Sequence, residues 1–263
     1  MSNKPKLKIY RVPASHPCQA VIRGAQLKGI EYKLVDLLPL TQPVVASALF
    51  GSRTVPAMKI YGEAGGTQKV QTTVKCLRAL ESLVPEPALY PSDAAARERV
   101  MAAESWGVGE FQDLARRLTW VALQKRPETF FSFASDAKLP LPEKMLKPFG
   151  KPTIFGERLL NGARIDRARE DLEALPGHLD EIDKLISDGT IGGVTPNAAD
   201  LTILSSVWLL RSLGDLREIL DSRPAGRRTI ELFGGAPGDI PEGAFPSEWL
   251  APVEAARGSY VPA

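Results

Sequence analysis

The stretch LKIYRVPASHPC, residues 7–18, carries the signals that decide the fold of the N-terminal half. Leu7 and Ile9 lie in a short β-prone run that stops at Pro13, as a buried strand would. Residues 15–17 then supply a cap-like serine and a proline suited to the first turn of a helix. The stretch therefore predicts a strand that leads directly into a helix.

The residues after this stretch continue the alternation of strands and helices. From Cys18 the apolar positions follow helical spacing, and Gly29 stands at the expected helix end. The following segments predict a strand at 32–37 and a short helix at 43–50. They also predict a hairpin of strands 55–60 and 69–71 that turns at 62–66, and then a helix at 72–83. A β-α-β start implies a parallel strand pair, and the hairpin adds antiparallel pairing. Residues 1–84 therefore predict an α/β domain.

A proline-rich linker at 85–93 separates this domain from a helical half. Its prolines cannot continue a helix and favour a stiff connection. Residues 94–233 predict an all-helical bundle, with a helix capped at Asp93 and a helical pair over 166–186 that breaks near Pro176. The last residues, 234–263, predict a Pro/Gly-rich tail extended on the surface.

The helix that follows residues 197–200 is predicted to lie at the centre of the bundle. Asn197 and Asp200 have the spacing of a capping box, in which each side chain bonds to the other residue's backbone. The residues after this cap are apolar nearly all round, which is typical of a buried helix.

Composition narrows the class of protein. Hydrophobic residues make up 44% of the chain, charged residues 24%, and the formal net charge is +2, so we expect neither a nucleic-acid nor a membrane partner. The basic pair Arg116-Arg117 is interpreted as a solvated helix face. Two cysteines and no secretory leader favour the reducing cytoplasm, and two histidines argue against a metal site.

The chemistry is predicted to concentrate where the first strand meets the first helix. A residue at this position faces free backbone N–H groups and the positive end of the helix dipole, which together stabilise a thiolate. The hydroxyl of Ser15 can donate a hydrogen bond to a bound thiolate and keep it ionised. Residue types in this pattern therefore indicate thiol chemistry.

Several motifs, in order and at matching spacing, make the chain resemble the glutathione transferase superfamily over most of its length to about residue 215. They are residues 15–18, 28–32, 54–56, 80–87, 89–91 and 197–200. The resemblance implies a thioredoxin-like N-terminal domain that binds a thiol and an all-α C-terminal domain that binds the substrate.

The resemblance also implies roles for individual residues. Ser15 falls where zeta-class enzymes hold a catalytic serine and omega-class enzymes a cysteine, and Cys18 falls on the second cysteine of a glutaredoxin-like C-x-x-C. Pro56 matches a cis-proline that frees the Val55 backbone to pair with the ligand. The whole implied thiol-binding set is His16, Pro17, Arg53, Val55, Pro56, Gln71, Thr72 and Thr73. Trp106 and Phe111 are expected to line the substrate pocket.

One position departs from the family pattern. Thr72-Thr73 stands where the family has Glu-Ser or Gln-Ser, so Thr73 keeps a hydroxyl at a helix N-terminus, whereas Thr72 supplies no charge for a γ-glutamyl ammonium. Gln71 is expected to compensate in part. The expected cofactor is therefore glutathione or another low-molecular-weight thiol such as mycothiol, with no metal.

The leading hypothesis is an enzyme that activates such a thiol for attack on an apolar electrophile. The alternatives are thiol–disulfide exchange at Cys18, an isomerase reaction through a thiol adduct, and a non-catalytic module for ligand binding or interaction. Cys18 also fits a small buried hydrophobe, and Cys76 is interpreted as a core residue. A homodimer is expected from the resemblance.

Overall fold

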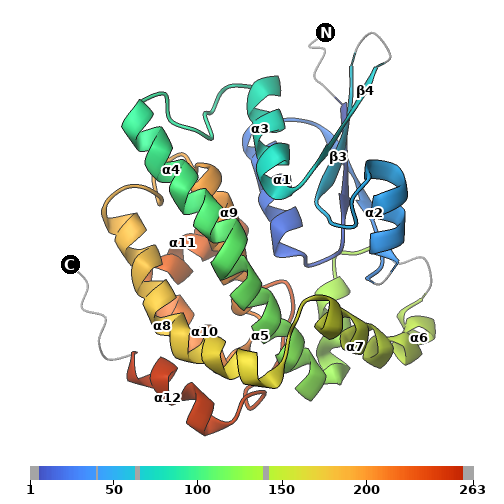
Figure 1. Cartoon of the computed structure of the whole chain (residues 1–263), viewed down its shortest axis with the longest axis vertical. Helices are drawn as coiled ribbons and strands as arrows, with labels where there is room; N and C mark the ends of the chain where they lie inside the picture. The colour runs from blue at the N-terminus through green and yellow to red at the C-terminus, as the bar shows by residue number, and fades with distance from the viewer. Residues whose placement is uncertain (1–5, 40, 63–65, 139–141, 257–263) are drawn as a thin grey trace.

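The computed structural model describes residues 6–39, 41–62, 66–138 and 142–256, which form two domains packed against each other (Figure 1). The first domain follows the predicted order of elements. These are β1 (Lys6–Arg11), α1 (His16–Leu27), β2 (Tyr32–Asp36), α2 (Gln42–Phe50), β3 (Ala57–Tyr61), β4 (Thr67–Gln71) and α3 (Thr73–Leu83). The central residues of the predicted turn at 62–66 lie outside the described residues.

The sheet has the strand order β2-β1-β3-β4, with β1 and β2 parallel and the other pairs antiparallel. Because side chains alternate across a strand, Ile9 of β1 packs toward α1 and α3, whereas Tyr10 packs toward α2. Figure 1 shows α1 and α3 on one face of the sheet and α2 on the other. This is the predicted thioredoxin-like arrangement.

The second domain is helical. It contains α4 (Ala94–Trp106), the π-helical turn η1 (Gly107–Phe111), α5 (Gln112–Lys125), the 3₁₀ turn η2 (Pro127–Ala134), α6 (Glu143–Leu146), η3 (Lys147–Phe149), α7 (Gly150–Leu160), α8 (Ile165–Ser187), α9 (Ala198–Leu210), α10 (Gly214–Ser222), α11 (Pro224–Phe233) and α12 (Ser247–Ala255). Every residue of α9 is buried, and both halves of the capping box at Asn197 and Asp200 are present. The predicted central helix is therefore confirmed.

A buried lysine anchors the linker between the domains. The Nζ atom of Lys28, at the end of α1, lies 2.6 Å from a carboxylate oxygen of Glu81. The same ammonium donates to three backbone carbonyls, those of Val84 (2.6 Å), Pro85 (3.2 Å) and Pro87 (2.9 Å). Glu81 in turn accepts from the backbone N–H of Leu89, at 3.0 and 3.1 Å, and Leu89 is fully buried. The linker is thus fastened to the first domain at several points.

Two segments differ from their predictions, α8 and the segment that begins at residue 234. The helical pair over 166–186 is a single helix, α8, that continues through Pro176, because Leu172, Leu175 and Leu179 around it are fully buried and hold the helix against the core.

The C-terminal segment from residue 234 is not simply an extended surface tail. Ile240 is fully buried and pairs its backbone with Gly214 and Ser212, both at 2.8 Å. The helix α12 then packs on α8 and buries Leu250 and Val253. Glycines and prolines interrupt this segment, so its sequence gives no clear periodicity. Residues 257–263 of the predicted tail lie outside the described residues.

Candidate functional site

A cavity of about 990 Å³ lies between the two domains. The first domain lines it with the loop that joins β1 to α1, the segment before β3, and the start of α3. These three segments contribute most of the residues predicted to bind a thiol. They are His16, Pro17, Arg53, Val55, Pro56, Thr72 and Thr73, and Ser15, predicted to be catalytic, lies with them.

The loop after β1 places Ser15 at the mouth of α1. Its chain turns back through Ala14, which has a left-handed φ of 57°, and the N–H of Ser15 donates to the carbonyl of Val12 at 3.1 Å. Ser15 precedes the first residue of α1, but its hydroxyl does not cap the helix. That hydroxyl is instead hydrogen-bonded to the Cys18 thiol and remains a lining group of the cavity.

The start of α3 and the segment before β3 meet at the same cavity. The Val55–Pro56 peptide bond is cis, as the resemblance implies, and the carbonyl of Pro56 accepts from the N–H of Thr72 at 3.1 Å. Thr72 has a φ of 79°, and Thr73 begins α3, so the unpaired N–H groups of a helix N-terminus open at this point.

Backbone strain gathers at this cavity. Within the described residues, Ala14 and Thr72 are the non-glycine residues with a left-handed φ, and both line it. Such conformations cost about 1–3 kcal/mol each and persist where the surrounding structure enforces them, which is common at binding sites.

The opposite wall comes from the helical domain and carries a group of aromatic side chains. It contains Trp120, Phe130, Phe131, Phe133 and Phe149. Polar residues of the same wall are Gln112, Arg116, Thr119, Thr153, Glu157 and Asn161. The cavity thus joins a polar pocket on the first domain to an apolar one on the second.

Arg116 is a cation on the wall that faces Ser15. Its guanidinium lies 3.0 Å from a carboxylate oxygen of Asp113, and only 27% of its side chain is exposed. Burial lowers the pKa of Arg116 from its usual value, while Asp113 and Glu157 act in the opposite direction. Arg116 stays protonated near neutral pH, so it contributes positive charge to the cavity.

His16 lies at the site as a neutral imidazole. Burial holds its pKa well below the usual range, and the charge of Arg116 lowers it further. Its Nε2 atom is buried without a hydrogen-bond partner among the described residues. His16 therefore does not supply a positive charge to a bound anion.

Cys18 is not among the described residues that line the cavity. It is 1% exposed, and burial raises the pKa of its thiol to about 11, although a hydrogen bond with Ser15 acts in the other direction. Cys76, interpreted from sequence as a core residue, is fully buried in α3. Cys18 is therefore buried beneath Ser15 and is not part of the cavity lining.

Trp106 and Phe111 also lie away from the cavity. Their rings stack on each other, with centroids 5.2 Å apart, and both contact His178. Phe111 is fully buried. The π-helical turn η1 between α4 and α5 inserts an extra residue, and one residue corresponds to about 100° of helix rotation. Residues after it, such as Gln112 and Arg116, consequently take the positions facing the cavity.

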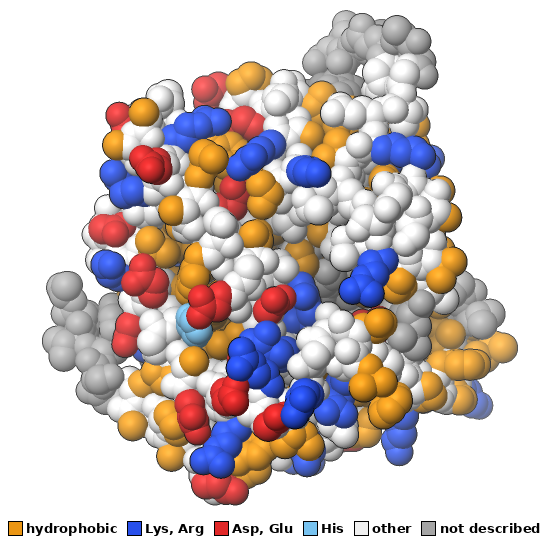
Figure 2. Space-filling view, viewed as in Figure 1, with side chains coloured by type: hydrophobic (Ala, Val, Ile, Leu, Met, Phe, Trp, Pro, Cys, Tyr) orange, Lys and Arg blue, Asp and Glu red, His pale blue; other side chains and the backbone are white. Residues whose placement is uncertain are grey.

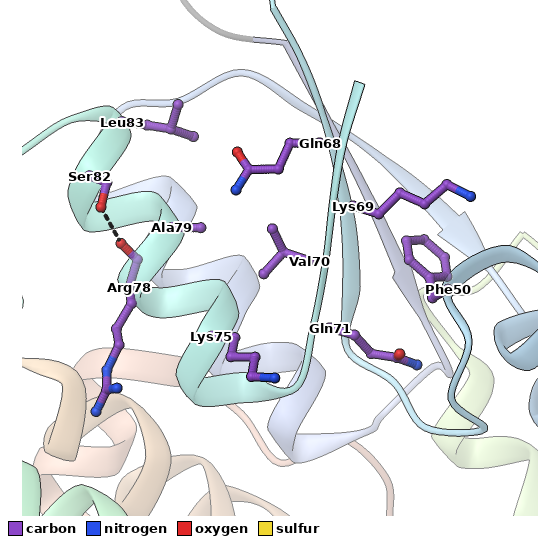
Figure 3. A pocket seen from close by; sticks show the side chains of 10 residues that line it. All are labelled: Phe50, Gln68, Lys69, Val70, Gln71, Lys75, Arg78, Ala79, Ser82 and Leu83. Carbon is purple, nitrogen blue, oxygen red and sulfur yellow. Dashed lines mark hydrogen bonds between the residues drawn. The ribbon is translucent and has the colours of Figure 1, made fainter. Parts of the chain in front are cut away.

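Gln71 lies in a second cavity, of about 600 Å³, between β4 and α3. Figure 3 shows it at the end of β4, among the residues that line this space. Its amide donates to the carbonyls of Ser52 (2.7 Å) and Thr54 (2.6 Å). Gln71 therefore supports the segment that leads to Pro56 and does not replace the charge that Thr72 lacks.

No group of three or more histidine, cysteine, aspartate or glutamate side chains suited to a metal ion occurs within 6–39, 41–62, 66–138 and 142–256. In the same ranges, no helix is both long enough and apolar enough to cross a membrane.

No protein-family model and no curated protein matches the chain. Solved structures do resemble it. They include a glutathione S-transferase from Rhodospirillum rubrum F11 (17% identity, 94% of this chain and 99% of that chain, TM-score 0.55), the beta-etherase LigF from Sphingobium sp. strain SYK-6 (17%, 86% and 98%, 0.54) and a maleylacetoacetate isomerase from Anaeromyxobacter dehalogenans 2CP-1 (22%, 96% and 95%, 0.50). The chain therefore has the fold of the glutathione transferases.

Proposed function

We propose that the protein activates a low-molecular-weight thiol at Ser15 for attack on an apolar electrophile held by the helical domain. The observation that carries this proposal is one cavity lined on one side by Ser15, Pro56 and the N-terminus of α3, and on the other by a cluster of aromatic rings. The first side suits a polar thiol with a carboxylate, and the second suits an apolar molecule.

The proposed reaction is a nucleophilic attack by the bound sulfur. The thiol loses its proton to solvent, and the thiolate accepts a hydrogen bond from the Ser15 hydroxyl. The sulfur lone pair then forms a bond to the electrophilic carbon. In a substitution this carbon expels a leaving group with its electron pair; in an addition to a double bond the π electrons move to the neighbouring atom, which takes up a proton from solvent. The site contributes by lowering the pKa of the thiol and by holding both reactants together. Positive charge from Arg116 favours the ionised thiol in the same way.

Ser15 is able to act on a ligand while bonded to Cys18. A hydroxyl has one hydrogen to donate and lone pairs that accept. Because burial keeps Cys18 protonated, we propose that its thiol donates to the Ser15 oxygen, which leaves the hydroxyl hydrogen to donate to the ligand sulfur. Cys18 is thus proposed as a positioning residue for Ser15.

The Ser15→Ala substitution tests the proposal. We expect it to raise the pKa of the bound thiol by about one to two units, because a hydrogen bond to a charged group contributes roughly 1.5–3 kcal/mol. Ultraviolet absorbance of the thiolate across a pH series measures this shift. Ser82→Ala is the matched control, since the Ser82 hydroxyl donates to the Arg78 carbonyl and Ser82 is not among the described residues that line this cavity. An identical titration in Ser15→Ala and the native protein would contradict the proposal.

The identity of the thiol is tested by thermal unfolding with glutathione, mycothiol, bacillithiol and coenzyme A. A ligand at about 100 times its dissociation constant stabilises the folded state by about 2.7 kcal/mol, so one compound is expected to stand out. If no thiol stabilises the protein, the non-catalytic alternative gains support. A homodimer and a cytoplasmic location stay predictions from the resemblance.

Thiol–disulfide exchange at Cys18 is disfavoured by the position of this residue. We expect Cys18→Ser to keep at least half of the transferase activity, because the serine hydroxyl preserves the contact with Ser15. We also expect native Cys18 to resist alkylation at pH 8, where a thiol of pKa about 11 is ionised in roughly one molecule per thousand. Rapid labelling of native Cys18, or a mixed disulfide trapped on it, would support exchange instead.

A further inference from the structure

An apolar surface runs along α6, η3 and α7, and nothing in the described chain covers it. Of the eleven large hydrophobic side chains exposed on the described residues, five lie within these eighteen residues. They are Met145 (57% exposed), Phe149 (62%), Phe155 (62%), Leu159 (68%) and Leu160 (51%). Figure 2 shows hydrophobic side chains gathered over this region, at the lower right of the view.

The five side chains divide into two groups. Phe149 and Leu160 also line the cavity, so they form its rim. The other three, Met145, Phe155 and Leu159, are not among the described lining residues. Phe155 and Leu159 are four residues apart, so they share one face of α7. The helix therefore presents apolar side chains both to the cavity and away from it.

Cations accompany the apolar face. The same eighteen residues contain Lys144, Lys147, Lys151 and Arg158 against two carboxylates, Glu143 and Glu157. The Nζ atom of Lys147 lies 3.6 Å from Oε1 of Glu143. Lys144 and Lys151 are exposed and form no ion pair with a described carboxylate. Apolar side chains interspersed with lysines are typical of helices that lie in the interface of an anionic membrane.

We propose that α6, η3 and α7 bind reversibly to the surface of an anionic lipid bilayer. Phe155, Leu159 and Met145 enter the boundary between headgroups and acyl chains, and Lys144 and Lys151 contact the lipid phosphates. Charge favours this occupant over a second copy of the chain, because the face carries unpaired lysines and would meet the same lysines across a twofold axis. The proposal concerns a surface contact and does not depend on thiol activation.

This proposal departs from the expectation that composition gives. A net charge of +2 over 263 residues and the lack of a long apolar segment argue against a membrane partner. Net charge and segment hydropathy are averages over many residues of the sequence. The apolar surface on α6, η3 and α7 is local and arises from residues that the fold leaves exposed.

The test is flotation of the full chain with vesicles of phosphatidylglycerol, of equal parts phosphatidylglycerol and phosphatidylcholine, and of phosphatidylcholine alone. We expect binding that rises with the anionic fraction and falls with added salt. Phe155→Ser combined with Leu159→Ser is expected to weaken it at least tenfold. Lys144→Gln combined with Lys151→Gln is expected to weaken it roughly 25-fold, since each basic residue near the surface contributes about fivefold.

Matched controls remove the same chemistry elsewhere. Val194→Ser with Ile230→Ser replaces two exposed apolar residues outside the surface, and Lys33→Gln with Lys184→Gln replaces two exposed lysines. Both pairs are expected to bind as the native protein does, and circular dichroism checks that all variants fold. The proposal is overturned by absence of binding, by equal binding to neutral vesicles, or by binding that Phe155→Ser with Leu159→Ser leaves unchanged. If the native chain self-associates and Phe155→Ser with Leu159→Ser abolishes that association, the surface binds a second copy of the chain and not a membrane.

Discussion

Replacing Lys28 by methionine is expected to lower the free energy of unfolding by about 3–5 kcal/mol, the usual cost of breaking a buried ion pair by removing one partner. The Lys28 side chain is fully buried, and its ammonium contacts Glu81 together with three carbonyls of the linker. Methionine fills a similar volume but donates no hydrogen bond, so the carboxylate and the carbonyls lose their cation.

Equilibrium unfolding in urea measures this loss. Lys184→Met is the matched control, because Lys184 makes an exposed pair with Glu181 at 3.6 Å, and such pairs contribute between roughly 0 and 1 kcal/mol. A loss below about 1 kcal/mol for Lys28→Met would mean that water replaces the ammonium and that the linker is held by its other contacts.

Asp200→Ala is the second substitution with a large expected effect. It is expected to lower the free energy of unfolding by about 3–5 kcal/mol. The Asp200 carboxylate is fully buried at the start of α9 and accepts from the N–H of Gly192 at 2.7 Å and of Asn197 at 2.9 Å. Hydrogen bonds to charged groups contribute roughly 1.5–3 kcal/mol each, and both N–H groups lose this partner in the variant.

Asp93→Ala is the control for a helix cap near the surface. Asp93 accepts from the N–H of Ala96 at 2.8 Å at an exposed helix start, where loss of a cap costs about 1 kcal/mol. Thermal and urea unfolding of both variants give the comparison. Equal losses for Asp93→Ala and Asp200→Ala would show that Asp200 acts only as a local cap and not as a bridge to the loop at Gly192.

The elements that are predictable from sequence are those in which a short local pattern determines the conformation. The cap at Asn197 and Asp200 and the strand that stops before Ser15 depend on neighbouring residues and on alternation, so both are recognisable without a structure. The placement of Ser15, Val55 and Pro56 around one cavity follows from the resemblance, because these residues are far apart in the chain.

The helical wall of the cavity was not predictable in the same way. Periodicity shows that Phe111 lies on an apolar face, but it does not show which neighbour covers that face. The π-helical turn at 107–111 changes which later residues face the first domain, and its sequence contains no recognised signal. Arg116 illustrates the result, since its sequence suggests a solvated helix face and the structure places it in the cavity wall. Phe130, Phe131, Phe133 and Phe149 come from short turns whose path depends on tertiary packing.

The anchored linker also limits how a ligand reaches the cavity. Lys28 fastens the linker to the first domain, and α1 packs directly on α9, so the domains are joined by both a tether and a broad helix contact. A hinge motion that separates the domains would have to break the contact between α1 and α9. Ligands are therefore expected to enter and leave the cavity at the rim formed by Phe149 and Leu160. Local opening of the chain at this rim would admit a ligand without a movement of the whole domain.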